Sequence, residues 1–125
     1  MNVPENLKYT KEHEWVRLEG DVAVVGITDF AQGELGDIVF VEVETVDEEL
    51  AADEVFGTVE AVKTVSDLFM PLGGEVIAFN EAVEDDPSLV NEDPYGDGWL
   101  IKIKLTDPLE AEGLLDAEGY KAHIA

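Results

Sequence analysis

Apolar and polar residues alternate in short runs along most of the chain, a pattern typical of β-strands. Residues 15–18 and 22–27 are two such runs, and Glu19-Gly20-Asp21 between them predicts a tight hairpin turn. Further runs cover residues 37–44, 55–62, 64–70, 75–79 and 99–105. A long turn, residues 91–98, separates the last two runs. We therefore predict a mainly β fold, with a single domain spanning residues 1–125.

Alternation also predicts which side chains share a face in two of these strands. In residues 37–44 one face holds Val39, Val41 and Val43, and the opposite face holds Ile38, Phe40 and Glu42. In residues 99–105 one face holds Trp99, Ile101, Ile103 and Leu105, and the opposite face holds Lys102 and Lys104.

Short helices are predicted in two places. Residues 28–36 have Asp29 as a capping residue, Gln32 three positions later and Gly36 at the end. In the tail, Asp107-Pro108-Leu109-Glu110 has the composition of a helix start, and two short helices are expected to follow. Gly113 and Gly119 are expected to keep both short. Four apolar tail residues are expected to pack on the strands: Leu114, Leu115, Tyr120 and Ile124.

Lys63 is the single basic residue between Leu18 and Ile101. It lies between two strand-like runs, where it is a candidate for the tip of a hairpin, although no Gly, Asn or Pro marks a turn there. One interpretation is a solvated charge that pairs with Glu60 or Asp67, an interaction worth about 0–1 kcal/mol. The other is a reactive amine that is acylated and so becomes a tethered arm.

The charge of the chain narrows the possible functions. Thirty acidic residues face seven Lys and Arg, a net charge of −23, so binding to nucleic-acid phosphates is not expected. A folded domain this acidic suggests a salt-rich, halophile-like cytoplasm, and the alternative is a surface that suits basic partners. There is no cysteine, so any redox group must be attached or bound.

The N-terminal residues, Met1-Asn2-Val3-Pro4-Glu5-Asn6, resemble neither a secretory signal nor a transit peptide, because they lack a basic segment and an apolar run. No apolar run approaches the length of a membrane span. We therefore expect a cytoplasmic protein without a membrane partner. The two histidines, His13 and His123, lie far apart in sequence, so no metal site is expected.

Several ordered blocks of the sequence resemble the glycine cleavage H-protein family, and together they cover almost the whole chain. The blocks are Lys8–Val16, Val25–Gln32, Leu35–Glu42, Gly57–Asp67, Gly74–Ile77 and Leu89–Ile103. The resemblance implies a barrel-sandwich hybrid of the lipoyl and biotinyl type with Lys63 at a hairpin tip. It also implies that lipoate is covalently attached to Lys63.

The same resemblance implies a carrier that does no catalysis itself. A pyridoxal-phosphate glycine decarboxylase loads an aminomethyl group, and a folate-dependent aminomethyltransferase removes the one-carbon unit. A flavin-dependent dihydrolipoyl dehydrogenase reoxidises the dithiol, and a lipoylating enzyme attaches the arm. We expect the carrier to be a monomer. The loaded arm is expected to rest in a cleft that excludes water, with Glu14 as the carboxylate that holds it and Asp67 as a second candidate.

Two other classes of protein share some of these features. A lipoyl domain of a 2-oxoacid dehydrogenase would be shorter and followed by a linker. A biotin carrier typically has Met on both sides of its lysine, where Val62 and Thr64 stand here. An acidic binding module without an acyl arm is the third alternative, and it would tolerate Lys63→Arg.

The charge predicts a strong dependence of stability on salt. Because a net charge of −23 repels itself in the compact state, we expect the melting temperature to rise as NaCl increases from about 0.05 M to about 1 M. Thermal unfolding followed by circular dichroism measures this. A melting temperature that does not change with salt would contradict the halophile-like interpretation.

Overall fold

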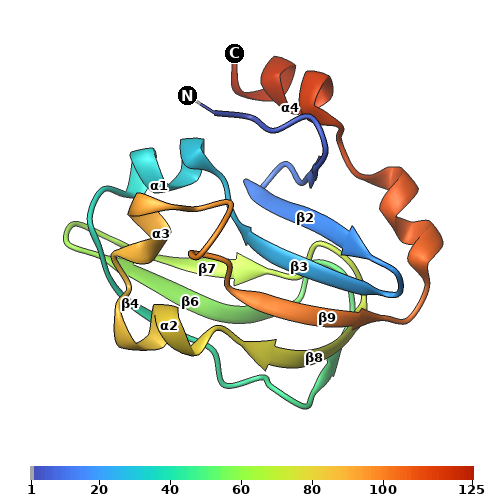
Figure 1. Cartoon of the computed structure of the whole chain (residues 1–125), viewed down its shortest axis with the longest axis horizontal. Coiled ribbons are helices and arrows are strands. Elements are labelled where there is room, and N and C mark those ends of the chain that lie inside the picture. Colours follow the sequence, from blue (N-terminus) through green and yellow to red (C-terminus); the bar gives the residue numbers. More distant parts are fainter. Residues whose placement is uncertain (1) are drawn as a thin grey trace.

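Two antiparallel sheets form the framework of the computed structural model, which describes residues 2–125 (Figure 1). The larger sheet has the order β1 (Lys8–Tyr9), β2 (Glu14–Glu19), β3 (Val22–Ile27), β9 (Ile101–Leu105), β8 (Gly74–Phe79) and β5 (Glu49–Leu50). The smaller sheet has the order β4 (Ile38–Glu42), β6 (Val55–Ala61) and β7 (Val65–Phe69). The mainly β prediction is confirmed, whereas Met1, the first residue of the segment judged above not to be a signal, lies outside the described residues.

Short helices connect or follow the strands. They are α1 (Asp29–Leu35), α2 (Glu81–Asp85), α3 (Leu89–Glu92), the 3-10 helix η1 (Pro108–Gly113) and α4 (Ala117–Ile124). None of the helices within residues 2–125 has the length and apolar character needed to cross a membrane.

The main core lies between the two sheets. The larger sheet contributes Val25, Ile101 and Ile103, and the smaller sheet contributes Val41 and Val59, all of them buried. Each large apolar side chain buried in this way contributes roughly 1.5–3 kcal/mol. A second cluster on the other face of the larger sheet is closed by α4 and is formed by Leu7, Tyr9, Trp15, Val24, Ala117 and Tyr120. The larger sheet is therefore covered on both faces near β2 and β3.

The predicted hairpin between residues 18 and 22 is confirmed. Glu19 pairs with Val22, and Gly20 has φ 66°, a conformation that glycine adopts without a steric penalty. The four apolar residues of the tail also pack as predicted, Leu114 on the main core and the others in the second cluster.

The faces predicted for residues 37–44 are confirmed from Phe40 onward, where Val41 and Val43 face the core and Phe40 and Glu42 are exposed, but they were wrong before it. Ile38 and Val41 are both buried, whereas Val39 and Phe40 are exposed. The register with β6 shifts between Ile38 and Phe40, which is a β-bulge. One extra residue in a strand reverses the alternation beyond it, so simple periodicity assigned Ile38 and Val39 to the wrong sides.

Other details of the prediction need correction. Residues 28–36 do form a helix that ends at Gly36, but its N-cap is Thr28, whose Oγ1 accepts a hydrogen bond from the Ala31 N–H at 3.1 Å. Asp29 instead accepts from the Gln32 side chain. Gly119 lies inside α4, where its N–H donates to the capping Asp116, so it does not end that helix.

The segment before the last strand also differs from the prediction. Helix α3 extends to Glu92, so only residues 93–98 form the turn. Trp99 lies outside β9 and packs against the second cluster, with Lys102 Nζ 5.1 Å from its ring centroid. The prediction that Trp99 shares the face of Ile101 was therefore wrong, because alternation does not continue beyond the end of a strand.

Candidate functional site

Lys63 lies at the tip of the β6–β7 hairpin, at the left end of the molecule in Figure 1. The Ala61 N–H donates to the Thr64 carbonyl at 2.7 Å, so Val62 and Lys63 form a two-residue connection. The Val62 N–H donates to the Asp37 carbonyl at 3.0 Å and ties the tip to the start of β4. Neither residue of the connection has a positive φ, which explains why the turn needs no Gly or Asn.

The side chain of Lys63 extends toward the end of α1. Its Cε lies 3.4 Å, and its Nζ 3.8 Å, from the position that a Cβ on Gly36 would occupy. Residues 2–125 form two ion pairs, Arg17–Glu19 and Lys121–Glu118. The pairing of Lys63 with Glu60 or Asp67 is therefore not formed in the part of the chain that the structure describes.

A cleft of about 210 Å³ opens beside this tip. Four carboxylates line it, from Glu12, Glu14, Glu34 and Asp67. The remaining lining side chains are largely apolar: His13, Ile27, Phe30, Ala31, Leu35, Val59, Ser66 and Leu68. Leu35 is the residue before Gly36, so the Lys63 side chain lies next to the helix end that borders the cleft.

The structure thus places both predicted cleft residues, Glu14 and Asp67, in one cavity next to Lys63. Glu12 and Glu34 were not predicted as lining residues. Glu12 lies two residues before Glu14, so proximity in sequence would have identified it. Glu34 reaches the cleft because α1 packs across it, which only the tertiary structure shows.

Glu14 differs from the other acids because only 2% of its surface is exposed. The Thr10 hydroxyl donates to its Oε1 at 2.7 Å, and the Glu14 N–H donates back to Thr10 Oγ1 at 3.1 Å. Burial raises the pKa of Glu14 from 4.5 to about 8, against the lowering effect of the hydrogen bonds. The group is therefore mainly protonated at neutral pH, and a cation held beside it would favour the carboxylate form.

His13 connects the cleft to the C-terminal helix. Its backbone is in the left-handed region with φ 73°, and its Nδ1 lies 2.9 Å from the Tyr120 hydroxyl. That hydroxyl lies 2.7 Å from Oγ1 of Thr28, the cap of α1. Burial, followed by the nearby His123, lowers the pKa of His13, so its ring is neutral at pH 7. One hydrogen-bonded chain thus joins β2, α1 and α4 behind the cleft.

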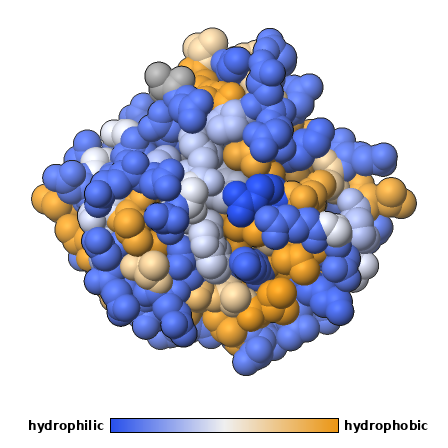
Figure 2. Space-filling model, viewed as in Figure 1, coloured by the Kyte–Doolittle hydropathy of each residue, from blue (hydrophilic) through white to orange (hydrophobic). Residues whose placement is uncertain are grey.

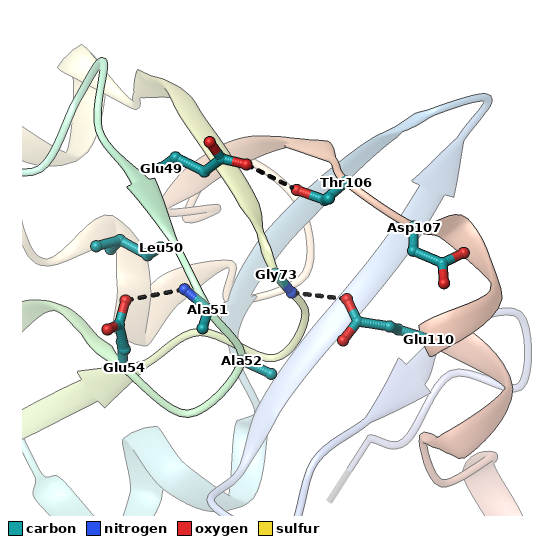
Figure 3. Close-up of a pocket in the computed structure, with 9 residues that line it drawn as sticks. All are labelled: Glu49, Leu50, Ala51, Ala52, Glu54, Gly73, Thr106, Asp107 and Glu110. Atoms are coloured by element: carbon teal, nitrogen blue, oxygen red, sulfur yellow. Dashed lines mark hydrogen bonds between the residues drawn. The ribbon is translucent and has the colours of Figure 1, made fainter.

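A larger cavity of about 580 Å³ lies away from the hairpin tip and is lined by residues near β5, β8 and η1 (Figure 3). Its carboxylates already have partners. Glu110 accepts from the Gly73 N–H at 3.1 Å, Glu54 accepts from the Ala51 N–H at 2.8 Å, and Glu49 accepts from the Thr106 hydroxyl at 3.2 Å. These acids hold loops in place. No group of three or more His, Asp or Glu residues within residues 2–125 is arranged to bind a metal ion.

The buried acid predicts a pH-dependent stability. Because the folded pKa of Glu14 is raised to about 8, the stability that this proton contributes is complete below the unfolded pKa and is lost as the pH rises through 8. Glu14→Gln keeps the site neutral. Its stability relative to the natural chain should therefore increase by roughly 4 kcal/mol from about pH 5 to about pH 9.

Thermal and urea unfolding of both proteins across this pH range measures the change, and a carboxyl NMR titration gives the pKa directly. An equal difference in stability at every pH would show that Glu14 ionises normally.

The similarity of this chain to known proteins shows the family to which it belongs. The family model of the glycine cleavage H-protein matches residues 7–125. A glycine cleavage system H protein from Bacteroides thetaiotaomicron is 66% identical over 124 residues, covering 99% of this chain and 98% of the relative. A glycine cleavage system H protein from Salinibacter ruber is 59% identical over 120 residues, covering 96% of this chain and 97% of the relative.

A solved structure agrees. The crystal structure of a glycine cleavage system H protein from Mycobacterium marinum superposes with a TM-score of 0.87 at 39% identity and covers 98% of both chains. The chain therefore belongs to the glycine cleavage H-protein family, the lipoyl carriers that shuttle the aminomethyl group between the enzymes of the glycine cleavage system.

Proposed function

We propose that Lys63 is the residue of this chain that carries lipoate, through an amide bond at Nζ. The observation that supports it is a lysine at an anchored hairpin tip, without an ion-pair partner among the described residues and next to a cleft. A primary amine at such a tip is accessible to an acylating enzyme, and acylation removes its charge. The lipoyl group supplies the two sulfurs that a chain without cysteine lacks.

The cleft suits the cationic, water-sensitive form of the arm. Its apolar lining, from residues such as Phe30 and Leu35, excludes water from a chain laid across it. Glu14 and Asp67 supply acceptors for an ammonium group, and the Thr10 hydrogen bond fixes the Glu14 carboxyl in place. Glu14 is thus the principal holding residue in this proposal, and Asp67 lies at the exposed side of the same cleft.

The partners follow from the family. The carrier serves the glycine decarboxylase, the aminomethyltransferase and the dihydrolipoyl dehydrogenase, and a lipoylating enzyme prepares it. We further propose that it works as a monomer in the cytoplasm. A tethered group reaches successive active sites at high effective concentration, so the carrier needs no tight complex with any of them.

Replacing the lysine tests the attachment. Lys63→Arg keeps the positive charge at the tip but removes the acylatable amine, so we expect a folded protein that supports no glycine cleavage. The measurement is glycine–bicarbonate exchange with purified decarboxylase and protein treated with a lipoylating enzyme. The matched control is Lys121→Arg, at an exposed site on α4. Full activity of the Lys63→Arg protein would end the carrier assignment for this residue.

The cleft predicts protection of the loaded arm. Replacing Glu14 by Gln removes the charged acceptor, so the aminomethyl group should be lost about tenfold faster, since hydrogen bonds to charged groups contribute roughly 1.5–3 kcal/mol. The measurement is the release of formaldehyde and ammonia from the loaded protein after the decarboxylase has been removed. Glu48→Gln, an exposed acid outside the cleft, should release them at the natural rate. Equal rates of release from the two variants would show that Glu14 does not hold the loaded arm.

A further inference from the structure

Apolar side chains are exposed around the tip that carries Lys63. Within residues 2–125, four of the nine exposed large apolar residues lie on β4 or beside the β6–β7 connection: Val39, Phe40, Val62 and Val65. Val62 is 74% exposed and Val65 is 62% exposed. In Figure 2 most of the visible surface is hydrophilic, and one of its several apolar areas lies at the left edge, the end where the hairpin tip lies in Figure 1.

The strand register places two of these residues on one face. Phe40 pairs with Glu60, and Glu60 pairs with Val65. Directly paired residues of neighbouring antiparallel strands point to the same side of the sheet. The adjacent pair Val41 and Val59 is buried against the larger sheet, so the row Phe40, Glu60 and Val65 is on the outer face.

We propose that this outer face, defined by Phe40, Val62 and Val65, is the docking surface for the enzyme that transfers the lipoyl group to Lys63. The inference rests on the proposed function of Lys63. It adds the surface by which the modifying enzyme recognises the carrier.

The position of the surface favours that enzyme over the others. Val62 is adjacent to Lys63 in sequence and Val65 is two residues away. An enzyme that acylates Nζ must bring its active site to the bare amine and must therefore contact the surface beside it. The other enzymes react at the far end of the lipoyl chain, so they can dock at a distance from the tip. Exposed apolar side chains beside a reacting atom are typical of an interaction site.

The charges around the surface define the partner's chemistry. Glu60 lies between Phe40 and Val65, and the next row on the same face, farther from the tip, holds Glu42 and Thr58. An apolar contact with an acidic border matches an enzyme surface that offers apolar side chains surrounded by Lys or Arg.

The acylation itself needs an activated lipoyl donor, such as an acyl-adenylate. The Nζ–acyl carbon bond forms, the bond from that carbon to the phosphate oxygen breaks, and AMP leaves. One proton is released from the amine. The docking surface contributes to this step only by holding the tip in the active site, so Phe40 and Val65 are positioning residues.

The test measures lipoylation by a purified ATP-dependent lipoate ligase that has first been shown to modify the natural chain at Lys63. If the ligase does not modify the natural chain, the proposed function of Lys63 is refuted. If it does, the comparison of the variants tests the docking surface alone. The double variant Phe40→Ser, Val65→Thr should reduce kcat/KM for lipoylation about tenfold, mainly through KM. Higher ionic strength should raise KM for the natural chain.

Matched controls exist elsewhere on the surface. Val55 is 43% exposed near the other end of β6, and Leu109 is 68% exposed on η1. The variant Leu109→Ser, Val55→Thr also replaces one large apolar residue by Ser and one Val by Thr, but away from Lys63, and it should be lipoylated at the natural rate. Because all four side chains are exposed, both double variants should keep a similar melting temperature, which is measured in parallel.

Three results would overturn the proposal. One is equal lipoylation of the two double variants. Another is normal lipoylation of the Phe40 and Val65 variant with a selective loss of decarboxylase turnover after full lipoylation, which would assign the face to the decarboxylase. The last is a dimer of the natural chain, seen by sedimentation, that the same variant dissociates, because the face would then bind a second copy.

Discussion

Packing of the smaller sheet against the larger one determines where Lys63 stands. Val41 and Val59 lie on the inner face of β4–β6–β7 and meet Ile101 and Ile103 in the same core. A two-stranded hairpin alone is marginally stable in water, so the β6–β7 tip stays in place because its strands are part of this core. The hydrogen bond from the Val62 N–H to the Asp37 carbonyl then fixes the last residues before the lysine. The Lys63 side chain therefore extends from a fixed point.

The same packing buries a carboxyl group in the cleft, and this burial lowers the stability of the fold at high pH. Helix α1 and the strands enclose Glu14, and a buried carboxyl without a cationic partner is kept neutral at the expense of stability at high pH. The hydrogen bond from Thr10 satisfies one oxygen. Because a cation would reverse the effect of burial on this group, the cleft is suited to distinguish a positively charged arm from a neutral one. Strained or costly groups of this kind concentrate at functional sites.

Much of the framework could be predicted from sequence because the relevant signals are local. Gly20 marks the first hairpin, and alternation identifies most of the longer strands. The β4 bulge could not be predicted, since an extra residue between Ile38 and Phe40 is set by pairing with a strand far away in sequence. Thr28 and Asp29 are adjacent and both suit an N-cap, so only the backbone conformation distinguishes them.

How well the sequence predicts the site differs from residue to residue. Lys63 stands out as a lone base, although the turn that carries it has no sequence marker because neither of its residues needs a positive φ. Glu14 is one of 30 acids, and nothing local in the sequence shows that it is the buried one. The prediction of Glu14 as a cleft residue rests on the resemblance to H proteins, and tertiary packing explains its altered pKa. The apolar outer face near the tip was not predicted, because alternation alone does not show which of two apolar faces is exposed, and the bulge leaves Val39 exposed as well as Phe40.

Peptide mass spectrometry can show whether Lys63 carries the lipoyl group. The protein would be purified from native cells that contain lipoate and are growing on glycine. We expect a mass increase of one lipoyl group, located on the peptide that contains Lys63. An unmodified mass for the whole chain from such cells, or a lipoyl group located on another lysine, would contradict it.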